Sequence, residues 1–266
     1  MMKGNIAYEL LVLCLILLVC HGCKKAEKGS KSLRQKGNDG YVLAQGITPQ
    51  STRSQEAIAR KTLTLQRKFT EASLTLGAPI FLRIFKESQE LEVWVKQDRE
   101  FVLFKTYPVA YFSGTLGPKL REGDEQAPEG FYYVSPSRMN PHSKFHLSFN
   151  IGYPNLYDQA HQRTGSAIMV HGNTVSIGCF AMTDSLIEEI YTIADHALNG
   201  GQRFFRVHIF PFLMTDENMA RYAQSPHVDF WKNLQEGYIL FEQKHHPPNV
   251  TVEQNQYAFE SDEDGL

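Results

Sequence analysis

A series of short apolar segments between residues 80 and 210 constrains the fold more than any other feature of this chain. Each segment is rich in β-branched and aromatic residues and is bounded by polar or glycine-containing turns, the pattern of β-strands. An amphipathic helix would need a longer pattern with apolar residues three and four positions apart. The sequence therefore predicts strands over residues 80–85, 91–95, 101–104, 131–134, 167–170 and 204–210.

Helical patterns flank these strands. Apolar residues recur at three- and four-residue spacing over residues 56–76, and a second apolar stripe runs through residues 186–198. Ser185 and Glu188 have the spacing of a capping box at the start of this second helix. Residues 214–244 predict one or two further helices. Because 12% of the residues are aromatic, a sheet-rich core is favoured over a helical bundle, and the predicted class is mainly β, of the α+β type, with flanking helices.

The N-terminal residues indicate export. Residues 10–19 form an apolar run with the length of a signal-peptide core, shorter than a bilayer span. The segment Cys20-His21-Gly22-Cys23 follows, and its small residue before a cysteine resembles a bacterial lipoprotein processing site. We therefore expect a periplasmic protein whose Cys23 is lipidated and anchored in the outer membrane. An ordinary cleaved signal and an uncleaved anchor are the alternatives.

The four cysteines are unevenly placed. Cys14 and Cys20 lie in the leader and Cys23 is assigned to the lipid, so Cys179 has no partner for a disulfide in the mature chain. An unpaired thiol in an exported protein is either buried and inert or retained for its reactivity. The count alone does not choose between the two.

The segment from residue 168 to residue 179 carries the candidate chemistry. A predicted strand ends at His171, and Cys179 follows eight positions later, just before a predicted helix. This spacing allows a tight turn to bring thiol and imidazole within hydrogen-bonding reach. An imidazole and a helix N-terminus both stabilise a thiolate, so we expect a depressed pKa for Cys179. Backbone amides beside Gly178 are expected to hold an oxyanion, although a packed structural His–Cys pair fits the spacing equally well.

This stretch resembles the signature of the YkuD-type L,D-transpeptidases, in which a His-Gly precedes a Ser-x-Gly-Cys. The matching residues are His171-Gly172 and Ser176-Ile177-Gly178-Cys179. The segment Ala127-Pro128-Glu129-Gly130-Phe131 is similar to a turn of the same domain, and residues 79–241 resemble the YafK branch of the family. The landmarks of that branch are residues 117–124, 147–150, 163–166 and 205–212.

The resemblance implies a β-sandwich with flanking helices and assigns roles to the matching residues. Cys179 would be the nucleophile, His171 the general base, and no cofactor would be needed. Support of the oxyanion and substrate would come from Gly172, Ser176, Ile177 and Gly178. Taken by itself, Ser176 is explained equally well as a turn residue.

Three basic residues are candidates for holding a substrate carboxylate. The family usually has an arginine shortly after the cysteine, where this chain has Phe180-Ala181. The candidates that could replace it are Lys119, Arg121 and Arg163, and each is explained equally well as a surface charge or a structural ion pair.

Histidines elsewhere in the chain do not predict a metal site. His142, His146 and His161 share neither a ligand-like spacing nor an acidic partner pattern. His208 alternates with apolar residues in a strand, so we expect a core histidine whose hydrogen bonds are satisfied.

The implied activity is acyl transfer on peptidoglycan stem peptides through a Cys179 thioester. Attack on the thioester by an amine gives transpeptidation, whereas attack by water gives hydrolysis. The likeness to the YafK branch adds an amidase that releases a peptidoglycan-linked lipoprotein from diaminopimelate. A non-catalytic wall-binding lipoprotein is the rival hypothesis, and it predicts a buried, unreactive thiol. The net charge of −2 gives no indication of a nucleic-acid partner, and membrane contact is expected only through the N-terminal lipid.

The expected organisation follows from these segments and from composition. Lys, Ser, Gln and Gly dominate the region after the leader, which predicts a flexible tether, and the acidic C-terminus with Pro247-Pro248 predicts a disordered tail. The predicted regions are a signal peptide (1–22), a tether (23–57), a linker helix (58–77), a catalytic domain (78–213), C-terminal helices (214–244) and the tail (245–266).

Overall fold

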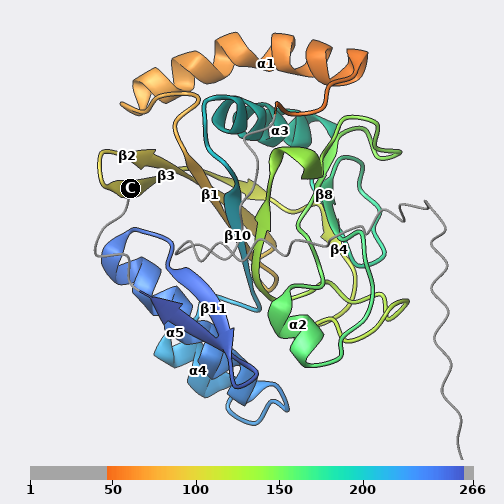
Figure 1. Cartoon of the computed structure of the whole chain (residues 1–266), viewed down its shortest axis with the longest axis vertical. Helices are drawn as coiled ribbons and strands as arrows, with labels where there is room; N and C mark the ends of the chain where they lie inside the picture. The colour runs from red at the N-terminus through yellow and green to blue at the C-terminus, as the bar shows by residue number, and fades with distance from the viewer. Residues whose placement is uncertain (1–46, 261–266) are drawn as a thin grey trace, which may run out of the picture. The chain divides into compact units, whose positions relative to one another are not determined.

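Two five-stranded sheets organise residues 47–260, the part of the chain that this computed structural model describes (Figure 1). Sheet A has the order β3-β2-β1-β10-β5, and sheet B has the order β4-β9-β8-β7-β6. The strands of sheet A are β1 (Ile80–Phe85), β2 (Glu90–Gln97), β3 (Glu100–Pro108), β5 (Gly130–Val134) and β10 (Phe205–Phe210). Those of sheet B are β4 (Tyr111–Phe112), β6 (Met139–Asn140), β7 (Ser148–Asn150), β8 (Met169–His171) and β9 (Phe180–Ala181). The predicted combination of sheets with flanking helices is confirmed.

The central strand β1 of sheet A is buried on both faces because its residues alternate between two apolar surroundings. In β1, Ile80, Leu82 and Ile84 face a core shared with sheet B, whereas Phe81 and Phe85 face the C-terminal segment. All six residues of β1 are buried. Successive side chains of a strand point to opposite faces, so one run of apolar residues supplies both cores.

Two helices cover one side of the sheets (Figure 1). The helix α3 (Asp184–Asn199) contacts β7 and β8, and α1 (Thr52–Glu71) packs on α3. Thr183 caps α3, because its hydroxyl accepts the Leu186 N–H at 3.4 Å. The predicted capping box at Ser185 is therefore wrong by two residues, and Glu188 binds side chains from other elements instead.

The N-terminal boundary differs from the prediction. Helix α1 begins at Thr52, and Ser51 caps it through the Ser54 N–H at 3.2 Å. Upstream, Thr48 donates to Asp195 at 2.5 Å and so holds the chain against α3. The predicted tether is thus wrong for residues 47–57, because composition did not reveal these tertiary hydrogen bonds. The helix also ends earlier than expected, since Ser73 adopts a left-handed φ of 59°.

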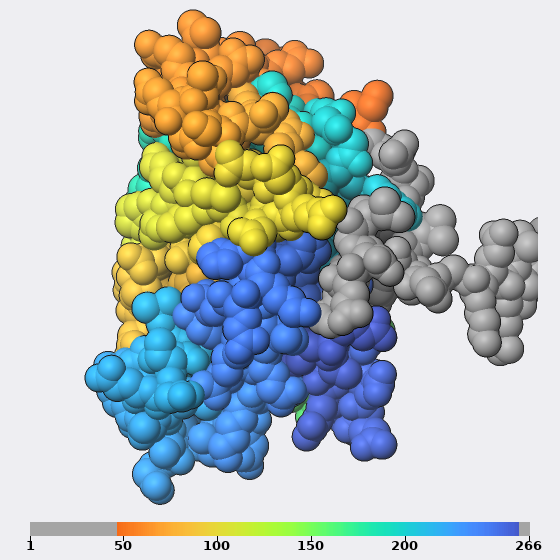
Figure 2. All heavy atoms as spheres, turned by 90° about the vertical axis from the view of Figure 1, so that its left-hand side faces the viewer, coloured from red at the N-terminus to blue at the C-terminus, as the bar shows by residue number. Residues whose placement is uncertain are grey.

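The C-terminal segment covers the outer face of sheet A. It consists of α4 (Asp216–Arg221), α5 (Val228–Lys244) and a hairpin of β11 (Asn249–Glu253) and β12 (Gln256–Glu260). Figure 2 shows α5 beside the β2–β3 edge of the sheet, with α1 beyond that edge. The predicted disorder is wrong for residues 249–260, because Tyr257 is buried and pairs through its backbone N–H and C=O with the Asn233 amide.

The remaining helices are short. The helix α2 (Leu156–Ala160) follows the capping residue Asn155, and a 3-10 turn spans Pro136–Arg138. Among the described residues, no helix has the length and apolar character needed to cross a membrane. The predicted signal peptide, the lipidation of Cys23 and most of the tether lie outside the described residues.

Candidate active site

His171 and Cys179 project from the same face of sheet B. Strands β8 and β9 are parallel, with Val170 paired to Phe180 and His171 paired to Ala181. Val170 and Phe180 are fully buried in the core between the sheets. Because neighbouring residues of an extended segment point to opposite faces, His171 at the end of β8 and Cys179 just before β9 point away from that core. The structure therefore brings the two predicted residues to one surface.

The imidazole of His171 is held by its neighbours. Its Nδ1 lies 2.5 Å from the carbonyl oxygen of Gly172, which can only accept, so Nδ1 carries the proton and Nε2 is the basic nitrogen. The ring of Phe145 covers it, with centroids 4.8 Å apart, and only 2% of His171 is exposed. Burial lowers the pKa of His171, and the Gly172 carbonyl partly opposes this. A neutral imidazole at neutral pH follows.

The thiol of Cys179 is half-buried and contacts backbone rather than imidazole. Its Sγ accepts the Met169 N–H at 3.3 Å and lies 3.8 Å from the Ala167 carbonyl oxygen. Among the described residues it forms no hydrogen bond with His171, so the predicted contact is not made in this conformation. Catalytic hydrogen bonds are often long before substrate binds.

The predicted depression of the Cys179 pKa is wrong. Burial raises the pKa of the thiol, while the Met169 N–H, the charge of Lys119 and the Ser176 hydroxyl act in the opposite direction. The helix N-terminus contributes little, because β9 separates Cys179 from α3, which begins only at Asp184. The site therefore holds a thiol beside a neutral base.

The loop before the cysteine is rigidly supported. Ser176 donates to the Cys179 carbonyl oxygen at 2.7 Å, which favours the supporting role over a simple turn residue. Gly178 has a φ of 102°, a conformation that favours glycine, and its N–H donates to the Ser113 hydroxyl at 2.5 Å. The N–H of Cys179 has no acceptor within residues 47–260. It is therefore available for an oxyanion, whereas that of Gly178 is occupied.

Gly172 and Ile177, the other predicted support residues, have different surroundings. The Gly172 N–H donates to the carbonyls of Phe145 and Leu147 at 3.0 and 3.1 Å, so it cannot serve an oxyanion. A Cβ at this position would lie 2.9 Å from the backbone carbonyl oxygen of Phe145, so only glycine fits beside the base. The side chain of Ile177 is 75% exposed at the rim of the site.

The three basic candidates divide into two groups. Arg163 is buried and pairs with Asp158 at 2.9 Å, and Lys119 is buried and pairs with Asp124 at 2.5 Å. Both are structural ion pairs, although the charge of Lys119 still acts on the thiol. Arg121 is exposed, and its guanidinium has no partner in the described part of the chain. It is the candidate that remains available for a substrate carboxylate.

The glycine- and proline-rich loop over residues 113–130 is fastened by a fully buried ion pair. Lys86 Nζ lies 3.0 Å from Glu129 Oε1 and donates to the carbonyls of Gly117 and Ala127 at 2.8 and 3.0 Å. The other Glu129 oxygen accepts the Trp231 indole N–H at 2.8 Å. These bonds join both limbs of the loop to sheet A and to α5.

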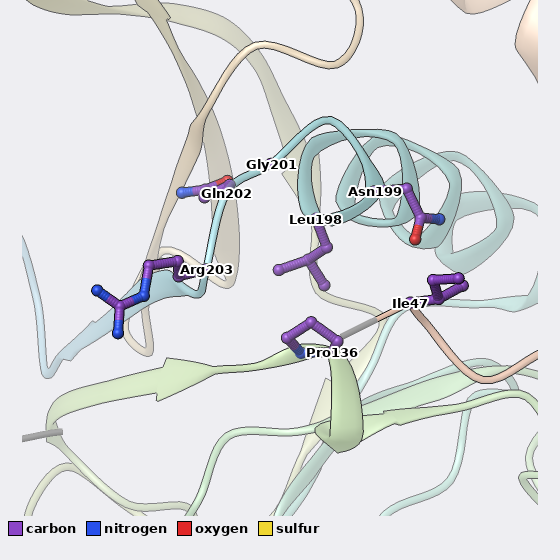
Figure 3. A pocket seen from close by; sticks show the side chains of 7 residues that line it. All are labelled: Ile47, Pro136, Leu198, Asn199, Gly201, Gln202 and Arg203. Carbon is purple, nitrogen blue, oxygen red and sulfur yellow. The ribbon is translucent and has the colours of Figure 1, made fainter. Parts of the chain in front are cut away.

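The structure was also searched for a metal site and for pockets outside this site. Within residues 47–260, no group of three or more His, Cys, Asp or Glu side chains is arranged to hold a metal ion. A pocket at the C-terminal end of α3 contains neither His171 nor Cys179 (Figure 3), and its lining residues are Ile47, Pro136, Leu198, Asn199, Gly201, Gln202 and Arg203.

Sequence reasoning missed Ser113, Phe145 and Met169. Ser113 is the first residue of the glycine- and proline-rich loop, and nothing in the sequence singles out its hydroxyl. Met169 acts through its backbone N–H, which every residue except proline has. Phe145 lies outside every predicted element. Each of these contacts depends on tertiary placement.

Comparison with known proteins places this site in a family. The model of the YkuD L,D-transpeptidase catalytic domain matches residues 80–209. The protein named "Putative L,D-transpeptidase YafK" from Escherichia coli (strain K12) is 44% identical over 183 residues, which cover 69% of this chain and 74% of that protein. The chain belongs to the YkuD L,D-transpeptidase family. The protein of the same name from Escherichia coli O157:H7 matches this YkuD-family chain with the same identity and coverage.

Solved structures give weaker likenesses. The helical cell shape determining protein Pgp2 from Campylobacter jejuni has a TM-score of 0.41 and 16% identity, covering 71% of this chain and 80% of that one. Bd1075 from Bdellovibrio bacteriovorus has a TM-score of 0.36 and 16% identity, covering 66% and 78%.

Proposed function

We propose that this YkuD-family protein is a periplasmic cysteine acyl-transfer enzyme that acts on peptidoglycan stem peptides through a thioester at Cys179. The observation that supports this most is the shared surface of sheet B, where an unpaired, half-buried thiol lies beside a histidine whose Nε2 is the basic nitrogen. The rival wall-binding role predicts an inert, buried thiol and would not need an oriented base.

The proposed first step is deprotonation of the thiol by the imidazole. His171 Nε2 accepts the proton as Sγ attacks the amide carbonyl at the L-centre of diaminopimelate, after the thiol turns from the Ala167 carbonyl. Because burial raises the pKa of Cys179 and lowers that of His171, proton transfer accompanies the attack and no stable ion pair forms beforehand.

The remaining steps use the amide of Cys179 and the imidazolium. The Cys179 N–H donates to the oxyanion. The leaving amine then takes the proton from His171, and the thioester remains. Attack by a second amine gives transpeptidation, and attack by water gives hydrolysis. Arg121 binds a substrate carboxylate, because its exposed guanidinium has no partner among residues 47–260.

The test uses the full chain and purified sacculi that retain bound lipoprotein, with mass spectrometry of the products. New cross-links or amine exchange that disappear in Cys179→Ala support a transpeptidase. Release of lipoprotein or peptide that disappears in the same variant supports a hydrolase. Equal products from wild type and Cys179→Ala would overturn the proposed enzyme.

The proposed location is tested separately. We propose that Cys23 is the lipidated residue of a protein anchored in the outer membrane. Fractionation of wild type and Cys23→Ser, with mass spectrometry of the mature N-terminus, is expected to show loss of the lipid and of membrane association in the variant. A Cys23→Ser protein that stays equally membrane-bound would contradict the lipid anchor.

A further inference from the structure

The loop over residues 141–146 joins α1 to the catalytic histidine. Ser51, which caps α1, donates to the Pro141 carbonyl oxygen at 2.9 Å. Arg53, in the first turn of α1, donates from one guanidinium nitrogen to the carbonyl oxygens of Ser143 and His146 at 2.8 and 2.7 Å. These three bonds place the N-terminal end of α1 directly on the loop.

The same loop covers and orients His171. Phe145 places its ring 4.8 Å from the imidazole, and its carbonyl oxygen accepts the Gly172 N–H at 3.0 Å. Gly172 in turn supplies the carbonyl that fixes the His171 tautomer. Both the burial of the base and the choice of its basic nitrogen therefore depend on where this loop lies.

Phe145 does not hold this position by burial alone. Its side chain is 40% exposed, so packing fixes it less firmly than a core residue. A second set of bonds acts beside Arg53, because Glu188 on α3 lies 2.9 Å from His146 Nε2 and 2.6 Å from an Arg60 nitrogen. The loop is thus held between α1 and α3 by Arg53 and Glu188.

We infer that Arg53 is a positioning residue for the catalytic base: it fixes the loop over residues 141–146, which holds Phe145 and the Phe145 carbonyl against His171 and Gly172. The inference rests on the proposed role of His171. It also makes α1 part of the catalytic unit, although α1 precedes the residues matched by the family model.

The experiment measures the pH dependence of Cys179 alkylation by iodoacetamide in the full chain, together with turnover on sacculi. In wild type, the alkylation rate is expected to rise as His171 loses its proton, below the ordinary histidine pKa of about 6.5. In Arg53→Ala the inflection is expected to move up towards that value, because the base becomes more solvated. Turnover is expected to fall about five-fold or more, with KM little changed.

Two variants separate positioning from general effects. Arg53→Lys keeps a donor for the two carbonyls and is expected to restore part of the wild-type profile. Arg67→Ala removes an exposed arginine from the same helix whose guanidinium has no polar partner among residues 47–260, and is expected to behave as wild type. Circular dichroism and thermal unfolding check that each variant is folded.

The failures are distinguishable. If Arg53→Ala keeps the wild-type inflection and turnover, the positioning role is overturned while the proposed enzyme stands. If His171→Asn leaves the wild-type inflection in place, the base role of His171 is overturned, and the inference about Arg53 is overturned with it.

Discussion

His171 in sheet B and His208 in sheet A are buried to the same degree, with 2% and 1% of each residue exposed. Their surroundings differ. His171 has a carbonyl partner at 2.5 Å and shares a face of sheet B with a half-buried thiol. His208 lies between Phe81 and Phe131, with ring centroids 4.6 and 4.7 Å away, and neither ring nitrogen has a hydrogen-bond partner in the described part of the chain. The expectation of a satisfied core histidine at this position is therefore wrong.

This contrast shows that burial alone does not identify a functional histidine. Burial lowers the pKa of both imidazoles, and nearby Arg206 and Arg83 lower that of His208 further. What distinguishes His171 is a fixed tautomer and a half-buried thiol on the same face of sheet B. Sheet A is a packing layer with aromatic cores, whereas the proposed chemistry belongs to sheet B.

The largest expected effect separates the two histidines by activity. His171→Asn is expected to lower turnover on sacculi by roughly 10²- to 10⁴-fold, the range for losing a general base. His208→Leu is expected to keep turnover near the wild-type value, because its ring faces the aromatic core away from the thiol. Comparable losses in both variants, with both proteins folded, would contradict the division between the sheets.

The second prediction concerns a buried group that carries a charge. Lys86→Met leaves the Glu129 carboxylate buried without its cation, and is expected to cost about 3–5 kcal/mol of unfolding free energy. Lys86→Met combined with Glu129→Gln is expected to recover part of this, because the amide still accepts a hydrogen bond. Denaturant unfolding measures both. Lys105→Met, in a partly exposed pair with Glu189, is the control and is expected to cost under about 1 kcal/mol.

A mild effect of Lys86→Met, equal to that of Lys105→Met, would show that the loop tolerates an unpaired charge through relaxation or water entry. The buried pair would then not be what fastens residues 113–130. The cost of a buried unpaired charge matters for His208 as well. Its ring stays neutral and so avoids that cost.

The third prediction uses the sign of the histidine pKa shift. The folded-state pKa of His208 lies well below its unfolded value, so the unfolded chain binds the proton first as the pH falls. Stability present above about pH 6.5 is then lost at up to about 1.4 kcal/mol per pH unit for this group. His208→Leu removes this loss, and is expected to add about 1–3 kcal/mol at neutral pH by removing an unsatisfied polar ring.

Denaturant unfolding at several pH values checks this. The wild-type curve is expected to fall more steeply below the unfolded histidine pKa than that of His208→Leu. The slope that remains in the variant includes the contribution of His171, whose pKa is lowered in the same direction. Identical pH dependence in both proteins would mean that His208 titrates equally in the folded and unfolded states.

The strands and the sequence positions of the site residues could be predicted, but the environment of the site could not. Short runs rich in β-branched and aromatic residues predict β1 and β10, because residue type and the flanking turns are local properties. β4 and β9, with two residues each, are too short to show any period. The pKa of Cys179 was missed because burial is set by the assembled sheets, and the hairpin was missed because Tyr257 depends on Asn233 from α5.

The smallest expected effect tests how finely the sheet B site is held. Ser113→Ala removes the acceptor of the Gly178 N–H without touching the thiol or the base. Losing one such hydrogen bond is worth about 1 kcal/mol, so turnover on sacculi is expected to fall between about two-fold and ten-fold. Thr115→Ala is the matched control in the same loop, since its exposed hydroxyl has only a long 3.4 Å contact with the Leu116 carbonyl.

If the two variants have equal turnover, the Gly178 amide is held without Ser113. If only Ser113→Ala is slow while its thermal stability stays near wild type, then a single bond beneath the cysteine loop sets the position of the Cys179 amide. In that case the two sheets differ in how they respond to change: sheet A loses stability when it is altered, and sheet B loses rate.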